Sequence, residues 1–328
     1  MLNTIEESVA FRPINQAYQS VFRPARLSLG LVVPIESYPV SDTPTMHRHI
    51  ERVQLAEALG FSAVWLRDVP FKVPSFGDAG QNFDPFVYLG ALSATTSRIG
   101  LGVASIILPL RHPAHVAKAA ATADVLSNGR LLLGVASGDR PEEYPALDIS
   151  FSDRGKRFRD SYAYIRQVGE NAPRFDNPLG QVAGGMEMLP RPVGGRLPLL
   201  ITGASQQSAE WVASHGDGWM TYPRPAQLQS QMIDQFNTKA KQAGEPPKPV
   251  MEPLYIDLED DANATAQPIH LGLRLGVNAL RRYLTSRQAI GINHIALNLR
   301  FNSKDTEQTL RTIAAEILPT FNQEDKDK

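Results

Sequence analysis

The segment 199–222, LLITGASQQSAEWVASHGDGWMTY, has residue types and spacing that suit binding of an anion. The pattern predicts a buried strand, a corner at Gly203, Ala204 and Ser205, a helix over 205–215, and a second strand. The start of a helix favours anions because its first N–H groups have no partner within the helix. A glycine at the corner allows the backbone to approach a ligand closely.

Hydroxyl groups and a lack of acid support the anion interpretation of this helix start. Ser205 and Ser208 can both add hydrogen-bond donors, and the predicted first turn, 205–208, contains no carboxylate. The last predicted helix differs, because Asp305 and Glu307 fill its first turn with acids in the ordinary way. The alternative interpretation is that Ser205 simply caps the helix, which is a common role for serine.

A second corner rich in glycine and serine follows the preceding buried strand in the sequence. The strand predicted over 129–137 ends in Ala136, Ser137 and Gly138 and then turns toward a helix. Two successive strands therefore end in corners that could face a ligand together. Polar residues also end other strands, notably Arg67 and Asp68, but loops collect polar residues in any protein.

Other patterns that carry chemistry are weak or absent. The 328 residues include no cysteine, which excludes disulfides, thiolate metal sites, iron–sulfur clusters and cysteine nucleophiles. The pair His47 and His49 falls inside a predicted helix, and the pair His112 and His115 at a helix start, rather than at strand ends. No Gly-x-Ser-x-Gly elbow, phosphate-binding P-loop or complete dinucleotide fingerprint is present. We therefore predict no metal site.

Composition and charge narrow the class of protein. Apolar residues make up 42% of the chain, enough for a substantial core, and the net charge of −1 gives no electrostatic footprint for nucleic acid or anionic membranes. No apolar run approaches the roughly 20 residues that a membrane helix needs, and the N-terminal residues do not resemble a secretory signal. The expectation is a cytoplasmic enzyme that acts on a small molecule.

Eight short aliphatic runs alternate with segments of helical periodicity after residue 26. The predicted strands are 27–33, 62–68, 98–108, 129–137, 197–203, 217–222, 250–258 and 293–300. The predicted helices begin at Thr43-Pro44, Asp84-Pro85, His112-Pro113 and Asp305, or cover 153–168, 205–215, 225–243 and 272–289. Eight such units close a (β/α)₈ TIM barrel, an α/β fold, whereas the alternative of an open doubly wound sheet rarely needs eight units.

The segments outside the eight units define the rest of the predicted organisation. An irregular N-terminal arm covers residues 1–26, one barrel domain covers 27–320, and a polar tail covers 321–328. The insertions expected around the barrel are 139–150 after the fourth strand, 171–197 with a short hairpin before the fifth, and 258–274 after the seventh. Active sites of such barrels lie at the carboxyl ends of the strands.

The segment 98–139, RIGLGVASIILPLRHPAHVAKAAATADVLSNGRLLLGVASGD, resembles the core of the bacterial luciferase-like flavin monooxygenases. The similarity rests on a glycine-containing strand, a His-Pro helix start, a Ser-x-Gly-Arg turn and a glycine-rich next strand. The segment 199–222 is similar to the second signature of this family, and EALGFSAVWLRD and GINHIALNLR resemble two further strand regions. The resemblance runs from about residue 27 to 300 and favours a family assignment.

The resemblance implies a cofactor at the carboxyl ends of the strands, either reduced FMN or the deazaflavin F420. It implies that the cofactor phosphate meets Ser137 and Gly138 on one side. The residues implied on the other side and around the cofactor are Gly203, Ala204, Ser205, Ser208 and Tyr222. Ala104 and Ser105 fall where several relatives have a non-prolyl cis peptide bond beneath the flavin ring.

One departure from the family pattern concerns proton handling. Luciferase-type members often carry a histidine just after the second strand, whereas this chain has Arg67 and Asp68 there. Asp68 could act as an acid or base if burial raises its pKa, or it could pair with Arg67. Both alternatives leave Arg67 and Asp68 as the candidate catalytic residues.

The function implied by the resemblance is that of an FMN-dependent oxidoreductase, in particular a two-component monooxygenase that receives reduced flavin from a separate reductase. The alternatives are an F420-dependent hydride-transfer oxidoreductase and a flavin-binding protein without turnover. The substrate would be a small organic molecule whose identity depends on the loops. Family members commonly dimerise through barrel helices, so a homodimer is expected by analogy.

Overall fold

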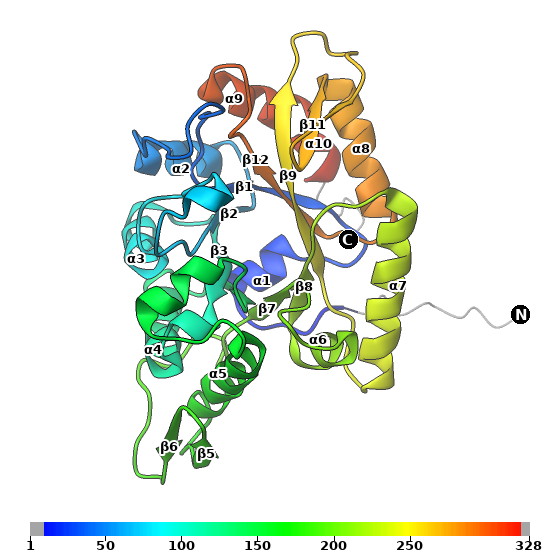
Figure 1. The fold of residues 1–328 in the computed structure, drawn as a ribbon. Coiled ribbons are helices and arrows are strands. Elements are labelled where there is room, and N and C mark those ends of the chain that lie inside the picture. Colours follow the sequence, from blue (N-terminus) through cyan, green and yellow to red (C-terminus); the bar gives the residue numbers. More distant parts are fainter. Residues whose placement is uncertain (1–9, 323–328) are drawn as a thin grey trace, which may run out of the picture.

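A closed ring of parallel strands forms the centre of the molecule (Figure 1). The computed structural model describes residues 10–322, and within this range eight strands make the ring. Around the ring they are β1 (Ser28–Val32), β2 (Ala63–Leu66), β3 (Gly100–Ile107), β4 (Leu131–Ala136), β7 (Leu199–Thr202), β8 (Gly218–Met220), β9 (Val250–Leu258) and β12 (His294–Asn298). Parallel pairing of β8 with β9 closes the ring. The single (β/α)₈ barrel predicted from the sequence is confirmed.

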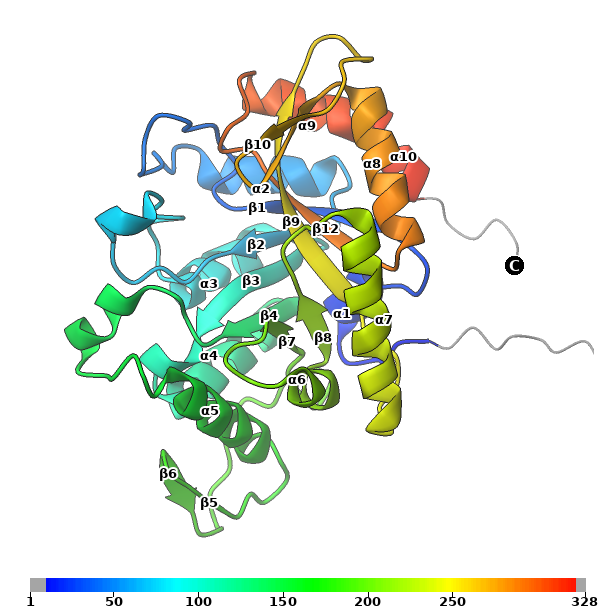
Figure 2. The same cartoon turned by 45° about the vertical axis from the view of Figure 1, so that its right-hand side comes forward.

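Helices cover the outside of the ring and connect successive strands (Figure 2). They are α2 (His49–Ala58), α3 (Pro85–Thr95), α4 (Pro113–Leu126), α5 (Arg154–Val168), α6 (Ala209–His215), α7 (Ala226–Gln242), α8 (Val277–Ala289) and α9 (Thr306–Glu316), with the short α10 (Leu318–Phe321) at the end. The side chains of Asp84, His112 and Asp305 cap α3, α4 and α9, as the sequence predicted. Within residues 10–322, no helix has the length and apolar character that crossing a bilayer requires.

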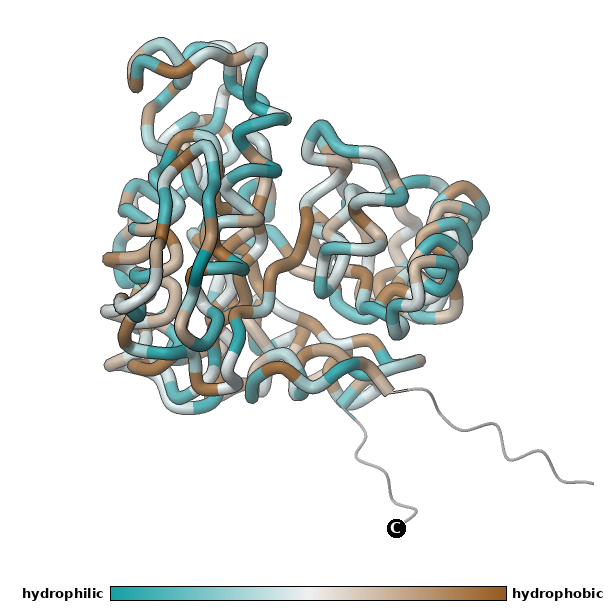
Figure 3. The backbone as a smooth tube through the Cα atoms, turned by 90° about the horizontal axis from the view of Figure 1, so that it is seen from below, coloured by the Kyte–Doolittle hydropathy of each residue, from teal (hydrophilic) through white to brown (hydrophobic). Residues whose placement is uncertain are grey.

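Side chains alternate along the ring strands between the barrel interior and the surrounding helices. On β2, Ala63 and Trp65 belong to the interior cluster, whereas Val64 and Leu66 pack with the outer helices. Hydrophobic segments, brown in Figure 3, are concentrated toward the inside, and the outer helices carry long hydrophilic stretches in teal. Continuing the alternation directs the side chain of Arg67 toward the barrel mouth, the end of the ring where the strands reach their carboxyl termini.

The N-terminal arm is more regular than predicted, because it contains a helix that packs against the opposite end of the barrel. Helix α1 (Gln16–Val21) buries Ala17, Tyr18 and Val21. The Ala17 N–H donates to the carbonyl of Gly129, just before β4, and the Tyr18 hydroxyl donates over 2.6 Å to the carbonyl of Asp217, just before β8. The arm therefore closes the amino-terminal end of the ring. Residues 1–9 of the predicted arm and 323–328 of the predicted tail lie outside the described residues.

Two insertions form hairpins. The hairpin predicted within 171–197 is present as β5 (Phe175–Asn177) and β6 (Gly180–Val182), which project away from the ring (Figure 2). A second hairpin, β10 (Gln267–Ile269) and β11 (Gly272–Leu275), replaces the predicted loop and helix start at 272, so the prediction there is wrong. The physical reason is that β11 extends the sheet by pairing in parallel with β9, and α8 starts only at Val277.

The first outer helix also begins later than predicted. The sequence favoured a start at Thr43-Pro44, but α2 starts at His49, after Arg48 with a φ of 54°. The cause is a contact with the preceding loop, because the buried carboxylate of Glu36 accepts hydrogen bonds from the N–H and hydroxyl of Thr45 at 2.5 and 2.9 Å. These bonds hold the chain before His49 in a loop.

Candidate active site at the barrel mouth

Ser105 and Thr202 meet on the inner wall of the barrel mouth. Their hydroxyls share a hydrogen bond, and the Thr202 hydroxyl lies 3.3 Å from the sulfur of Met220. The peptide bond between Ala104 and Ser105 is cis, as the family resemblance predicted. It falls where the pairing of β3 with β4 shifts register between Val103 and Ile106, so this part of β3 departs from regular strand geometry.

The corner after β7 differs from its prediction, because residues 205–208 form a turn rather than the first turn of a helix. Helix α6 begins at Ala209, and its cap is Ser208, whose hydroxyl accepts the N–H of Trp211 over 3.2 Å. Ser205 has a φ of 46° and donates through its hydroxyl to the carbonyl of Thr202 over 2.8 Å. The prediction that Ser205 lies in the first turn or caps the helix is therefore wrong.

The prediction that this helix start lacks acid is also wrong. Glu210 lies in the first turn of α6 and pairs with Lys239, which holds its pKa low, at about 2. The helix is therefore supplied with an acid in the ordinary way. Any anion site at this corner must depend on the turn that precedes α6, not on the helix.

The turn itself has a backbone conformation that suits an anion. Two consecutive residues after Ala204 have positive φ, 46° at Ser205 and 62° at Gln206. Gly203 has a φ of 56°, and a side chain built there would meet no atom within 4 Å, so open space lies over the corner. Consecutive N–H groups in a turn with positive φ form a concave site for an anion. The residues present fit a phosphate group.

The corner after β4 lies beside the corner after β7. The two strands pair in register with Val135 opposite Ile201, so Ser137 and Gly203 come two residues later on neighbouring strands. Gly138 has a φ of 75°, and a Cβ atom there would come within 2.6 Å of the Tyr144 hydroxyl, which donates to the carbonyl of Ser137. Tyr144, which sequence reasoning missed, therefore fixes this corner and requires glycine in it.

Asp68 and Arg67 do not pair with each other, which contradicts one of the two predicted alternatives. The carboxylate of Asp68 accepts the Ile107 N–H over 3.1 Å and two bonds from the guanidinium of Arg111, at 2.9 and 2.7 Å. Only 2% of the Asp68 side chain is exposed. Asp68 therefore connects the end of β2 to the residues that follow the cis peptide bond of β3.

Arg67 belongs to a different ion pair, centred on Asp78 in the loop after β2. One Asp78 oxygen lies 2.8 Å from Arg67 Nη1 and 3.1 Å from Arg300 Nη1, and the other accepts the Tyr38 hydroxyl over 3.2 Å. Burial opposes ionisation of Asp78, but the guanidiniums, Arg67 above all, outweigh it and lower the pKa of this carboxyl. The sequence pattern placed Arg67 and Arg300 at the ends of predicted strands, but no pattern pointed to Asp78.

A third arginine reaches the same place from the loop after β4. Arg140 donates through Nη2 to the backbone carbonyl of Asp78 over 3.2 Å, and its guanidinium lies 4.4 Å from the ring centre of Phe76. Its Nη1 is 3.9 Å from the carboxyl of Glu143, whose pKa burial raises to about 7 against the opposing effect of Arg140. We call Arg67, Arg140 and Arg300 the basic cluster.

The remaining predicted residues lie at the rim of the mouth. Tyr222 follows β8, is 51% exposed, and its carbonyl accepts from Arg224 over 3.0 Å. Ser208 is exposed and engaged as the cap of α6. Among the side chains of residues 10–322, no group of three or more His, Asp or Glu is placed to hold a metal ion.

The fold and the two corners define the class of protein, and comparison with known families gives it a name. The family model for luciferase-like monooxygenases matches residues 27–315, which includes every strand of the ring. The chain therefore belongs to the luciferase-like monooxygenase family, a family of oxidoreductases.

Individual relatives use different cofactors. The chain is 28% identical over 234 residues to the F420-dependent hydroxymycolic acid dehydrogenase of Mycobacterium tuberculosis. This match covers 68% of this chain and 60% of that protein. The monooxygenase RslO1 from Streptomyces bottropensis superposes with a TM-score of 0.76 at 21% identity, covering 90% of this chain and 99% of that one. The oxygenating constituent of 3,6-diketocamphane monooxygenase from Pseudomonas putida, in complex with FMN, superposes with a TM-score of 0.71 at 12% identity. This superposition covers 90% of this chain and 99% of that one. At these identities the two structures support the fold alone.

Proposed function

We propose that the chain is an FMN-dependent oxidoreductase, and in particular the oxygenating component of a two-component monooxygenase. The observation that carries this proposal is the row of consecutive backbone N–H groups on Ala204, Ser205 and Gln206, in a turn with positive φ and with open space at Gly203. Such a row binds a phosphate group without any cationic side chain. FMN has one phosphate group, so a flavin nucleotide matches this corner.

In this proposal the chain's own residues hold the cofactor and shape its surroundings. The N–H groups of residues 204–206 hold the phosphate, with Ser137 and Gly138 on the neighbouring strand as its other side. The hydroxyls of Ser105 and Thr202 present a polar point on the inner wall. When bound, reduced FMN supplies the electrons with which O₂ oxygenates a small organic substrate.

We assign different roles to the two predicted catalytic residues. Arg67 projects toward the mouth and is proposed to contact the substrate. Asp68 is proposed as a positioning residue, because its carboxylate accepts three hydrogen bonds and is almost completely buried. A separate reductase and a second copy of the chain remain the expected protein partners.

An F420-dependent hydride-transfer oxidoreductase is the second candidate. It is favoured by the sequence similarity to the F420-dependent dehydrogenase from M. tuberculosis, over 68% of this chain. We call the corner formed by residues 203–206 after β7, with Ser137 and Gly138 after β4, the phosphate corner. It suits F420 as well, because this deazaflavin also carries a phosphate. The two candidates therefore differ in the ring system and in the reaction with O₂, not in the anchoring of the phosphate.

Identification of the bound cofactor tests the proposal. The protein is purified, its visible absorption spectrum is recorded, and the released chromophore is identified by mass spectrometry. FMN, or affinity for added FMN together with substrate-dependent O₂ consumption in the presence of reduced FMN, is the expected result. A deazaflavin would overturn the FMN proposal in favour of the second candidate. FMN binding without any O₂ consumption across a panel of substrates would favour a flavin-binding protein without turnover.

A further inference from the structure

The basic cluster at the mouth has more positive charge than its own surroundings neutralise. Arg67 and Arg300 share the single side-chain carboxylate of Asp78, whereas Arg140 donates to the backbone carbonyl of that residue and has the Glu143 carboxyl 3.9 Å from its Nη1. Three guanidinium groups therefore face two carboxyl groups. We infer that the cluster binds the carboxylate group of an anionic substrate. The inference rests on the proposed function, since it names the substrate class of the same site.

Unused donors on the arginines support this inference. The Nε atoms of Arg67 and Arg300 are buried and have no hydrogen-bond acceptor, and the buried Nη1 atom of Arg140 faces the Glu143 carboxyl at 3.9 Å, beyond hydrogen-bond distance. Buried polar groups in native proteins nearly always have a partner, so three orphaned donors in one cluster require an explanation. Guanidinium groups match carboxylates in shape and bind them through paired N–H groups.

The contacts of Arg300 show how the cluster is held in place. Its Nη2 donates to the carbonyls of Ser41 and Gly77, at 3.1 and 2.8 Å, and its guanidinium lies 5.0 Å from the ring centre of Tyr38. Arg67 is fixed in turn by its bond to the Tyr38 hydroxyl over 3.2 Å. Preorganised cations of this kind bind an anion with little loss of side-chain entropy.

Aromatic side chains line the same part of the mouth. Phe301 lies 5.2 Å from the Arg300 guanidinium, and its ring is 5.4 Å from that of Tyr255, which projects inward from β9. A substrate with a ring next to its carboxylate would find both an apolar wall and a cationic partner here. Benzoate is therefore a suitable probe, and benzamide is its neutral counterpart.

Two of the three arginines lie across the mouth from the turn at residues 203–206 proposed for the cofactor phosphate. Arg67 and Arg300 follow β2 and β12, which flank β1, and β7 is the fifth strand counted around the ring from β1. In a ring of eight strands, the fifth lies directly opposite the first. The turn at residues 203–206 and these two arginines therefore start from opposite sides of the mouth, whereas Arg140 follows Gly138 by two residues and reaches Asp78 from the β4 side.

Calorimetric titration of the purified full-length chain with benzoate and with benzamide tests the inference. We expect benzoate to bind at one site per chain, with an affinity that falls as salt concentration rises, and benzamide to bind at least tenfold more weakly. Arg300→Gln and Arg67→Gln should each weaken benzoate binding at least tenfold. Arg282→Gln, an exposed change on α8, removes one charge elsewhere and should leave binding unchanged.

A gain in affinity provides a second readout that damage to the fold cannot produce. Asp78→Asn removes the carboxylate that competes for Arg67 and Arg300, so it should tighten benzoate binding. Equal binding of benzoate and benzamide, no binding of either, or no gain with Asp78→Asn would overturn the inference. Because FMN or F420 binding is measured separately, loss of benzoate binding with the cofactor retained refutes only the substrate class. If the protein bound neither FMN nor F420, the proposed function itself would be refuted.

Discussion

His294 illustrates how a single residue is held in one chemical state by its neighbours. Its side chain is completely buried in the barrel, where Nε2 accepts the indole N–H of Trp65 over 2.8 Å. Ser28 donates its hydroxyl proton to the carbonyl of Val21 over 2.7 Å, so its oxygen, 2.6 Å from His294 Nδ1, acts as an acceptor. His294 is therefore neutral with its proton on Nδ1, and burial lowers its pKa to about 3.

This state makes stability depend on pH. Below the ordinary histidine pKa of about 6.5 the unfolded chain takes up a proton that the folded chain refuses, so stability falls as the pH is lowered from 6.5 toward 3. The slope from this residue is at most ~1.4 kcal/mol per pH unit. Urea unfolding at pH 7 and pH 5 should show a smaller acid loss for His294→Gln than for the natural chain. Burial raises the pKa of Glu143, so this residue makes the fold more stable as the pH falls. The effect is present in both proteins and cancels in the comparison. Identical pH dependence of the two proteins would contradict this account.

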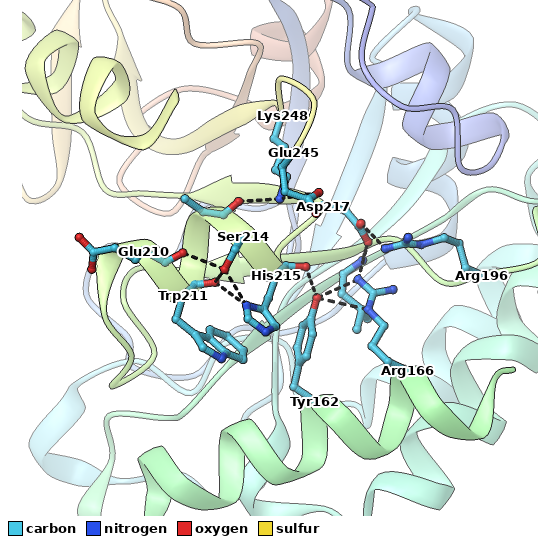
Figure 4. Close-up of polar contacts among 12 residues, drawn as sticks. Tyr162, Arg166, Arg196, Glu210, Trp211, Ser214, His215, Asp217, Glu245 and Lys248 are labelled. Carbon is cyan, nitrogen blue, oxygen red and sulfur yellow. Dashed lines mark hydrogen bonds and ion pairs between the residues drawn. The ribbon is translucent and has the colours of Figure 1, made fainter. Parts of the chain in front are cut away.

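At the scale of elements, Asp217 connects two strands and a helix at the amino-terminal end of the barrel (Figure 4). Its carboxylate accepts the N–H of Leu199 at the start of β7 over 2.9 Å and pairs with Arg166 of α5 over 2.6 Å. Arg196 forms a further ion pair with it. This network lies at the opposite end of the ring from the mouth, so its role is structural.

We predict that Asp217→Asn destabilises the fold by about 2–4 kcal/mol, because it leaves two partly buried guanidiniums without their carboxylate. Glu210→Gln is the matched control, since it removes a carboxylate of the same region whose side chain is 66% exposed and paired with Lys239. An exposed pair of this kind contributes less than about 1 kcal/mol. Free energies of unfolding in urea compare the two variants, and equal losses would contradict the assigned role of Asp217.

The elements show which features could be predicted from sequence. Asp84 and His112, each followed by proline, are local signals, and the helices begin there as predicted. Thr43-Pro44 carries the same local signal, but the bonds from Thr45 to Glu36 override it. The hairpin before α8 was missed because it depends on pairing of β11 with β9, which no local pattern shows.

In the candidate site, too, the residues with a local sequence signal were predicted, and those that depend on partners elsewhere in the chain were missed. The Gly203 and Gly138 corners were found because glycine at the end of a strand is a local signal for positive φ. The turn at Ser205 and Gln206 was missed because residues other than glycine rarely adopt positive φ. Asp78, Arg140 and Arg111 were missed because their partners lie in other loops, at separations that only the closed ring brings together.

At the scale of the whole molecule, the ring places the two ends of the barrel in separate roles. The arm helix α1 packs on the amino-terminal end, and the Tyr18 hydroxyl bonds there to the Asp217 carbonyl. The carboxyl-terminal end is left for chemistry, with the phosphate corner over β4 and β7 and the basic cluster contributed from the ends of β2, β4 and β12. This division agrees with the general placement of active sites in (β/α)₈ barrels.

Comparing the binding of FMN with that of riboflavin, which lacks the phosphate, tests the central claim most directly. Quenching of flavin fluorescence should show FMN binding at least ~10-fold more tightly, since hydrogen bonds to a charged group contribute about 1.5–3 kcal/mol. Ala204→Asp, which places a carboxylate on an exposed residue of the corner, should abolish this preference, whereas Ala91→Asp on the exposed face of α3 should preserve it. The same comparison with F420 and its phosphate-free chromophore covers the second candidate. Equal affinity for the forms with and without phosphate, or a preference that survives Ala204→Asp, would contradict the phosphate corner.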